Sequence, residues 1–199
     1  MNQCFRTLAL VAAALLAGCS AQPGAPEKPS PPLAGARLGG PLDLVDQDGR
    51  RVSERDFAGQ YRVIYFGYTY CPDVCPTDLQ KVAGALKLLE RDAPALAKRV
   101  TPIFVTVDPE RDSPAQVKQF VRAFHPRIVG LTGTPAEITK VEKDFAIFAQ
   151  KQPGTSPGSY LMEHSTAVYL FDPAGKPLAV LPNDKGPEEI AADIKRWAA

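Results

Sequence analysis

The sequence predicts an α/β fold built on a mostly parallel sheet, and three observations carry that prediction. Strand patterns alternate with helical patterns from about Leu33 to the end of the chain. Several of the helical patterns open with proline, which is typical of a first helical turn. Two apolar runs near the end follow each other across a short turn, which adds an antiparallel edge to the sheet. One domain without internal repeats is therefore expected.

The first predicted elements are a hairpin and a buried strand. In residues 42–53, the stretch Asp46 to Gly49 has the composition of a hairpin turn. Residues 61–68 form a continuous apolar run, as in a central strand that is buried on both faces. A helix should follow with Pro76 as its first residue, because apolar residues then recur at helical spacing: Leu79, Val82, Ala83, Leu86, Leu89 and Ala93.

The middle of the chain repeats this alternation. Residues 101–108 predict a second buried strand, and Ser113 is placed to cap the helix that follows it. A third apolar piece at 127–133 leads to a helix over 134–149. In that helix Thr134 and Glu137 have the spacing of a capping box, which makes its start well defined.

The last part of the folded region is predicted as a loop, a strand pair and a helix. Residues 150–160 are rich in Pro, Gly and Ser and are assigned to a loop. Residues 165–182 predict two strands joined at Asp172 to Lys176. Pro187 then opens the final helix.

The amino terminus has the pattern of an export signal. A short positive region ends at Arg6, and the twelve apolar residues 7–18 are too few to span a bilayer as a mature helix. The signal ends in Leu16-Ala17-Gly18-Cys19, which resembles the lipobox of bacterial lipoproteins. That resemblance implies that residues 1–18 are removed and that Cys19 carries the lipid. An ordinary cleaved signal that leaves a soluble protein is the alternative.

Between the signal and the domain the sequence predicts a tether. Residues 19–32 contain prolines 23, 26, 29, 31 and 32, and such a stretch cannot bury a core. In an extended polyproline conformation it would reach about 40 Å. We therefore expect a folded domain over 33–199 that is held away from a membrane on the extracytoplasmic side.

Composition and charge indicate whether a nucleic acid is an expected partner. Hydrophobic residues make up 45% of the chain and charged residues 23%, which is ordinary for a globular domain. Lys and Arg total 23 against 22 Asp and Glu, without a basic block. The charge pattern therefore does not favour a nucleic-acid partner.

The candidate chemistry lies in two cysteines. If Cys4 leaves with the signal and Cys19 is lipidated, the folded domain has only Cys71 and Cys75. Four positions apart at a helix start, their sulfurs can converge, and the helix amino terminus favours the thiolate. A structural disulfide, a redox pair and a metal site are all compatible with this spacing. The usual redox motif has two intervening residues and this one has three.

Two further residues bear on the choice between these readings. His164 is expected near a strand start that faces the cysteine loop, where thioredoxins keep a proline that is absent here. Two thiolates and an imidazole suit Cu(I), and with a water they could hold Zn(II). Asp108 ends the second buried strand on the same edge, where it could support the site or recognise a partner. A strand-ending turn would explain that aspartate equally well.

The order of the elements resembles the thioredoxin fold with an added N-terminal β-hairpin and an inserted strand and helix. Four separated motifs together resemble the Sco/SenC family of thioredoxin-like copper proteins: "FGYTYCPDVCP", "VTVDPERDSP", "FHPRIVGLTG" and "HSTAVYLFDPAG". They occur in the family's order and span nearly all of the folded part.

This resemblance implies a function and a ligand set. It implies that Cys71, Cys75 and His164 bind copper as Cu(I) or Cu(II), and that the protein helps to assemble the binuclear copper centre of cytochrome c oxidase subunit II. The protein would deliver copper, keep the cysteines of that subunit reduced, or do both. It would then need an upstream copper donor and a thiol reductant. A thiol-disulfide oxidoreductase and a redox or copper sensor use the same cysteine pair and remain alternatives.

Overall fold

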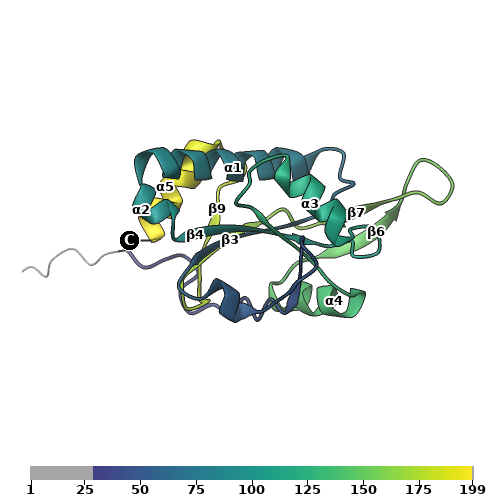
Figure 1. Cartoon of the computed structure of the whole chain (residues 1–199), viewed down its shortest axis with the longest axis horizontal. Coiled ribbons are helices and arrows are strands. Elements are labelled where there is room, and N and C mark those ends of the chain that lie inside the picture. Colours follow the sequence, from purple (N-terminus) through teal and green to yellow (C-terminus); the bar gives the residue numbers. More distant parts are fainter. Residues whose placement is uncertain (1–28, 199) are drawn as a thin grey trace, which may run out of the picture. The chain divides into compact units, whose positions relative to one another are not determined.

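A seven-stranded sheet organises residues 29–198, the part of the chain that the computed structural model describes (Figure 1). The strand order is β2-β1-β5-β4-β3-β8-β9. The three central strands β3, β4 and β5 are parallel, and β1 and β8 pair antiparallel with their inner neighbours. The strands are β1 (Leu44–Asp46), β2 (Arg51–Val52), β3 (Tyr61–Gly67), β4 (Val100–Thr106), β5 (Val129–Thr132), β8 (Val168–Phe171) and β9 (Pro177–Leu181). The predicted parallel sheet with an antiparallel edge is confirmed.

The two longest strands, β3 and β4, form the middle of the sheet. Every residue of β3 is buried, as the continuous apolar run predicted. The strands pair in parallel from Tyr61 opposite Val100 to Gly67 opposite Thr106. Because they end level with each other, the loops that follow them lie at one edge of the sheet. Those loops contain Cys71 and Asp108, and Cys75 follows in the first turn of the next helix.

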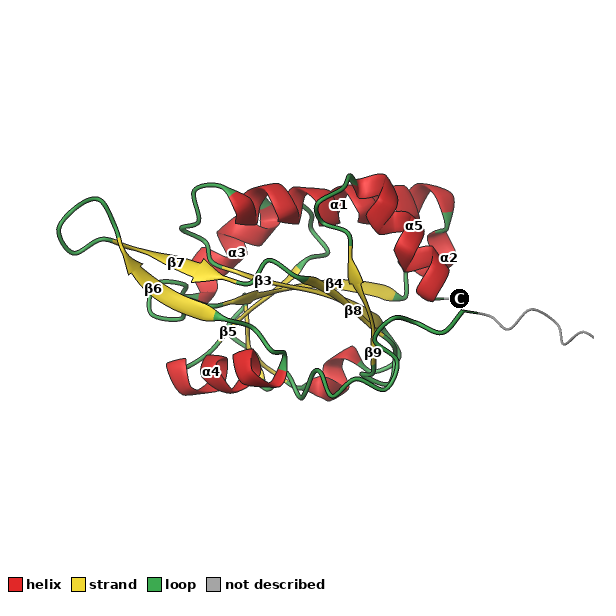
Figure 2. Cartoon of the chain, turned by 180° about the vertical axis from the view of Figure 1, so that it is seen from behind, coloured by secondary structure: helices red, strands yellow, loops and turns green. Residues whose placement is uncertain are grey.

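Helices cover both faces of the sheet (Figures 1 and 2). On one face lie α1 (Val74–Asp92), α2 (Pro94–Ala97), α3 (Pro114–Arg122) and α5 (Pro187–Trp197). On the other lie α4 (Pro135–Asp144) and the short 3-10 helix η1 (Glu54–Phe57). Together with the N-terminal hairpin β1–β2, this arrangement is the predicted thioredoxin-like fold.

Side-chain capping explains where α3 and α4 begin. The Ser113 side chain accepts a hydrogen bond from the Gln116 backbone, and Thr134 and Glu137 form the predicted capping box. The first long helix differs from the prediction, because α1 begins at Val74 and not at Pro76. Proline is tolerated through the first turn, where backbone N–H groups have no intrahelical acceptor. Cys75 therefore lies inside the first helical turn.

A separate two-stranded hairpin replaces the loop predicted for residues 150–160. It consists of β6 (Ala149–Pro153) and β7 (Tyr160–His164), which pair only with each other and project beyond the edge of the main sheet (Figure 2). The Pro, Gly and Ser residues mark only its turn. The prediction was wrong because these strands are largely exposed and lack the apolar alternation that identifies a strand packed on a core.

Residues from Pro31 onward form one compact unit. Near its start, the Leu33 backbone N–H donates to the carbonyl of Leu178 at 2.9 Å, which ties this segment to β9. The predicted signal sequence, Cys19 and most of the predicted tether lie outside the described residues. No helix within residues 29–198 has both the length and the apolar character to cross a membrane.

Candidate metal centre

Three elements bring one candidate ligand each to the same point. Cys71 lies in the loop after β3, Cys75 in the first turn of α1, and His164 is the last residue of β7. One donor atom from each residue lies within 4.8 Å of the other two. Sequence reasoning named all three, and the structure places them together although the cysteine loop and the histidine are about ninety residues apart.

Backbone contact orients the imidazole of His164. Its Nδ1 lies 2.9 Å from the carbonyl oxygen of Ser165. A carbonyl can only accept, so Nδ1 carries the proton and the neutral ring keeps its lone pair on Nε2. That Nε2 atom faces Cys75 Sγ at 3.2 Å. The rings of Tyr65 and Tyr68 meet the imidazole edge to face, with centroids at 6.5 Å and 5.8 Å, and shield it.

The two thiols occupy different environments, and their pKa values are shifted in opposite directions. Both are free, with Cys75 fully buried and Cys71 partly exposed. A hydrogen bond from the Cys75 thiol, opposed by burial, lowers the pKa of Cys71 to about 3, and the Cys75 backbone N–H also donates to Cys71 Sγ at 3.4 Å. The same side-chain hydrogen bond and burial raise the pKa of Cys75. The reduced pair is therefore a thiolate beside a thiol.

Close packing beneath the site favours a glycine at position 67. A Cβ there would lie 3.0 Å from Cys75 Sγ, 3.0 Å from the Tyr65 ring and 3.2 Å from the Phe104 ring. Gly67 therefore lets the end of β3 approach the helix that carries Cys75. The sequence offered a signal for this in the glycine that closes an otherwise bulky apolar strand, but its role depends on neighbours from other elements.

Asp108 belongs to a neighbouring cluster and not to the ligand group. Its carboxylate is buried and accepts a hydrogen bond from the Tyr160 hydroxyl at 2.8 Å. It also forms an ion pair with Arg111, whose Nε lies 2.5 Å away. Sequence reasoning named Asp108 but missed Arg111 and Tyr160. The charged turn "DPERD" after a buried strand was the available signal for Arg111, whereas Tyr160 fell in the stretch assigned to a loop.

The donor set fits a soft or borderline metal ion. Two cysteine sulfurs and one imidazole nitrogen with a free lone pair are ligands that copper and zinc accept. Binding at both sulfurs would displace the proton that Cys75 retains. Within residues 29–198, no fourth His, Cys, Asp or Glu belongs to this group. The group thus offers three donor atoms, and Cys71 is the more exposed of its two cysteines.

The fold and this cluster together define a thioredoxin-like protein with a Cys-Cys-His site at the edge of its central sheet. The sequence model of the SCO1/SenC family matches residues 30–199, and the chain belongs to that family.

Two solved structures and one curated relative illustrate the similarity. Bradyrhizobium japonicum ScoI with copper bound is 42% identical, with a TM-score of 0.73, and the match covers 80% of this chain and 99% of that one. Yeast Sco1 with copper bound is 36% identical, with a TM-score of 0.72 and coverage of 84% and 87%. The mitochondrial SCO2 homolog of Danio rerio is 39% identical over 156 residues, which are 78% of this chain and 55% of that protein. The chain thus spans about half of that relative's length.

Proposed function

We propose that this protein is a membrane-tethered copper metallochaperone that helps to build the binuclear copper centre of cytochrome c oxidase subunit II. The observation that carries the proposal is the convergence of Cys71, Cys75 and His164 within 4.8 Å. Two relatives of the same fold have been solved with copper bound, which supports copper as the cargo. Thiolate ligands favour Cu(I), and the imidazole also suits Cu(II).

The geometry supports a role in transfer more than one in storage. A carrier must release its cargo, and a site with few ligands lets an incoming donor atom replace a resident one. Cys71 is the exposed member of the cysteine pair, so an acceptor thiol or imidazole can approach the metal from its side. An upstream donor would load the same face.

Thiol chemistry at the same pair is the second candidate function, and the thiolate character of Cys71 favours it. The Cys71 thiolate would attack a disulfide of the target and release one target thiolate. The Cys75 sulfur, after losing its proton, would then attack the mixed disulfide, leaving a Cys71–Cys75 disulfide and a target dithiol. An external thiol reductant would restore the pair. Oxidation removes both thiolate ligands, so copper loading depends on the redox state.

Placement at the extracytoplasmic face of a membrane is part of the proposal. Removal of residues 1–18, lipidation of Cys19 and an extended 19–32 tether would hold the domain of residues 33–199 near a membrane-bound oxidase. Several acyl chains give stable anchoring, unlike a single one.

Anaerobic Cu(I) titration of the reduced, detergent-extracted protein tests the ligand set. His164→Ala should weaken Cu(I) binding about tenfold or more, because one of three ligands is lost. The variant should still form the Cys71–Cys75 disulfide, since both sulfurs remain. Equal copper affinity in the two proteins would rule out the three-ligand site.

A deletion strain separates delivery from reduction. Oxidase activity that recovers with added copper supports delivery, whereas recovery only with added thiol supports reduction of the target cysteines. A strain with unaffected oxidase activity would contradict both roles.

A further inference from the structure

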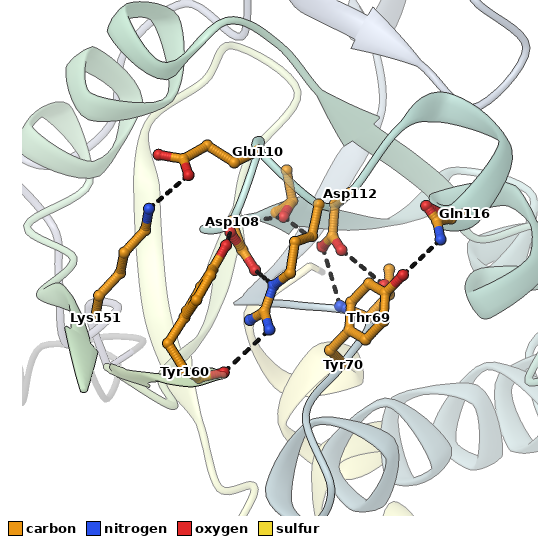
Figure 3. A network of polar contacts seen from close by, with 10 residues as sticks. Thr69, Tyr70, Asp108, Glu110, Asp112, Gln116, Lys151 and Tyr160 are labelled. Carbon is orange, nitrogen blue, oxygen red and sulfur yellow. Dashed lines mark hydrogen bonds and ion pairs between the residues drawn. The ribbon is translucent and has the colours of Figure 1, made fainter. Parts of the chain in front are cut away.

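The turn between β4 and α3 contacts both segments that carry the proposed copper ligands. It contains three charged residues that are buried or half-buried: Asp108, Arg111 and Asp112. Figure 3 shows the side chains of Asp108 and Asp112 near one another, with Thr69 and Tyr70 on one side and Tyr160 on the other. The first two of these neighbours precede Cys71, and the third begins the strand that ends in His164.

Asp112 holds the cysteine segment. Its side chain is fully buried and accepts three hydrogen bonds, from the Thr69 backbone N–H at 3.0 Å, the Thr69 hydroxyl at 2.6 Å and the Thr106 hydroxyl at 2.6 Å. Thr69 lies two residues before Cys71. A buried carboxylate with three short hydrogen bonds is costly to displace, so the start of the cysteine loop is held in place.

Asp108 and Arg111 hold the histidine segment through Tyr160. The Tyr160 hydroxyl donates to Asp108, and Arg111 Nη1 donates to the Tyr160 backbone carbonyl at 3.0 Å. The guanidinium also lies over the Tyr160 ring, 3.6 Å from its centroid. Tyr160 is therefore held at its hydroxyl, its ring and its backbone, and His164 follows four residues later at the end of the same short strand.

Arg111 is also the link between the two segments. Its guanidinium lies 4.9 Å from the ring centroid of Tyr70, next to Cys71, and 5.7 Å from that of Tyr68. Tyr68 in turn meets the imidazole of His164 edge to face. One cation thus contacts aromatic residues from the cysteine loop and from the histidine strand.

The hairpin needs such a clamp because its backbone does not join the main sheet. Strands β6 and β7 pair with each other only, so their position depends on side chains. Besides the Tyr160 cluster, the ties include the partly buried Met162 and Ala149, which pack against the core, and the exposed ion pair of Lys151 with Glu110. At the end of β7, His164 also contacts Cys75 Sγ and the rings of Tyr65 and Tyr68. An exposed ion pair such as that of Lys151 with Glu110 contributes little.

We infer that Arg111, held between Asp108 and Tyr160, is a positioning residue that sets His164 against the cysteine pair, while Asp112 holds the cysteine loop in register with it. The expected effect on copper binding rests on the proposed function, whereas the positioning of the hairpin by Arg111 does not. Groups that orient metal ligands typically change metal affinity by about 10-fold to 100-fold when they are removed.

Two variants and one matched control test the clamp in the full-length, metal-free, reduced protein. Arg111→Gln removes the guanidinium, and Tyr160→Phe removes only the hydroxyl bond to Asp108, so it provides the test if Arg111→Gln does not fold. Glu110→Gln is the control, because it breaks the exposed Lys151 contact between the same turn and the same hairpin. Amide hydrogen exchange, followed by NMR, reports on residues 160–164 and on β3 and β4.

The expected result is exchange about tenfold faster in residues 160–164 of Arg111→Gln, with a smaller increase in Tyr160→Phe. In both variants, amide exchange in β3 and β4 should match that of the wild type. In Glu110→Gln, amide exchange should match that of the wild type in the hairpin as well. Unchanged hairpin exchange in both variants would overturn the inference. An equal increase across the whole sheet would also overturn it, because it would show general destabilisation.

Cu(I) titration of the same proteins completes the test, with His164→Ala as the reference for a lost imidazole. Arg111→Gln should bind about tenfold more weakly than the wild type, and Glu110→Gln should bind equally. If His164→Ala weakens binding and Arg111→Gln does not, the positioning role is wrong. If the wild type does not bind copper, the proposed function is wrong, while a loosened hairpin would still support the clamp.

Discussion

The cysteine half and the histidine half of the candidate centre are built in different ways. Cys75 is fully buried in the first turn of α1 and packs against Gly67 of the central strand β3. His164 ends a hairpin whose strands have no fully buried residue and pair only with each other. One half of the site is therefore part of the core, and the other is attached to it by a few side chains. Local opening of the second half would therefore leave the fold intact.

Loss of a cysteine should weaken copper binding most, because it removes a thiolate ligand from the cysteine half of the site. We expect Cys71→Ser to weaken Cu(I) binding more than about a hundredfold, since a hydroxyl is a poor ligand for a soft ion. Thermal unfolding should change little, because Cys71 is partly exposed. Anaerobic competition titration against a Cu(I) chelator measures the affinity, and a loss smaller than that of His164→Ala would contradict this ranking.

The pH dependence of thiol reactivity tests the difference between the two cysteines. The pKa of Cys71 is lowered to about 3, so its thiolate persists as pH falls and is lost only near that value. Alkylation of the reduced, metal-free protein by iodoacetamide should therefore be nearly flat between about pH 5 and pH 8. For an ordinary thiol, the alkylation rate falls about tenfold for each unit by which the pH is lowered over that range. Peptide mapping should locate the label on Cys71, and a rate that tracks an ordinary thiol would contradict the lowered pKa of Cys71.

The close packing around Gly67, in the cysteine half, predicts that an added side chain there lowers the free energy of unfolding by a small but measurable amount. Gly67→Ala should lower the free energy of unfolding by about 1–3 kcal/mol, because the added methyl group meets buried neighbours that are held in the core. Denaturant unfolding of the metal-free protein measures it. An unchanged midpoint would show that the strand and helix can separate freely.

The matched change in the hairpin should have the smallest effect. Leu161 in β7 is 44% exposed. We expect Leu161→Ala to change the free energy of unfolding by no more than about 0.5 kcal/mol. A loss as large as that of Gly67→Ala would mean that the hairpin belongs to the cooperative core, and the contrast between the two halves would fail.

Local sequence signals predicted the core elements well. The continuous apolar run of β3 reports burial on both faces, and Thr134 with Glu137 satisfies the first turn of α4 whatever the rest of the chain does. The hairpin β6–β7 carries no such signal, because its strands are stabilised by pairing with each other and by side chains of the turn after β4. Tyr160, the first residue of β7, fell inside the predicted loop for that reason.

The sequence by itself determined the α/β order of the elements and, through four motifs, the family and the three candidate ligands. Residue type and spacing identify thiols at a helix start, because those properties are local. Only the tertiary structure decided what holds the ligands together: Gly67 beneath Cys75, Asp112 on the cysteine loop, and Arg111 with Asp108 on Tyr160. These contacts join segments that are distant along the chain, and single-residue patterns do not record which buried polar group pairs with which.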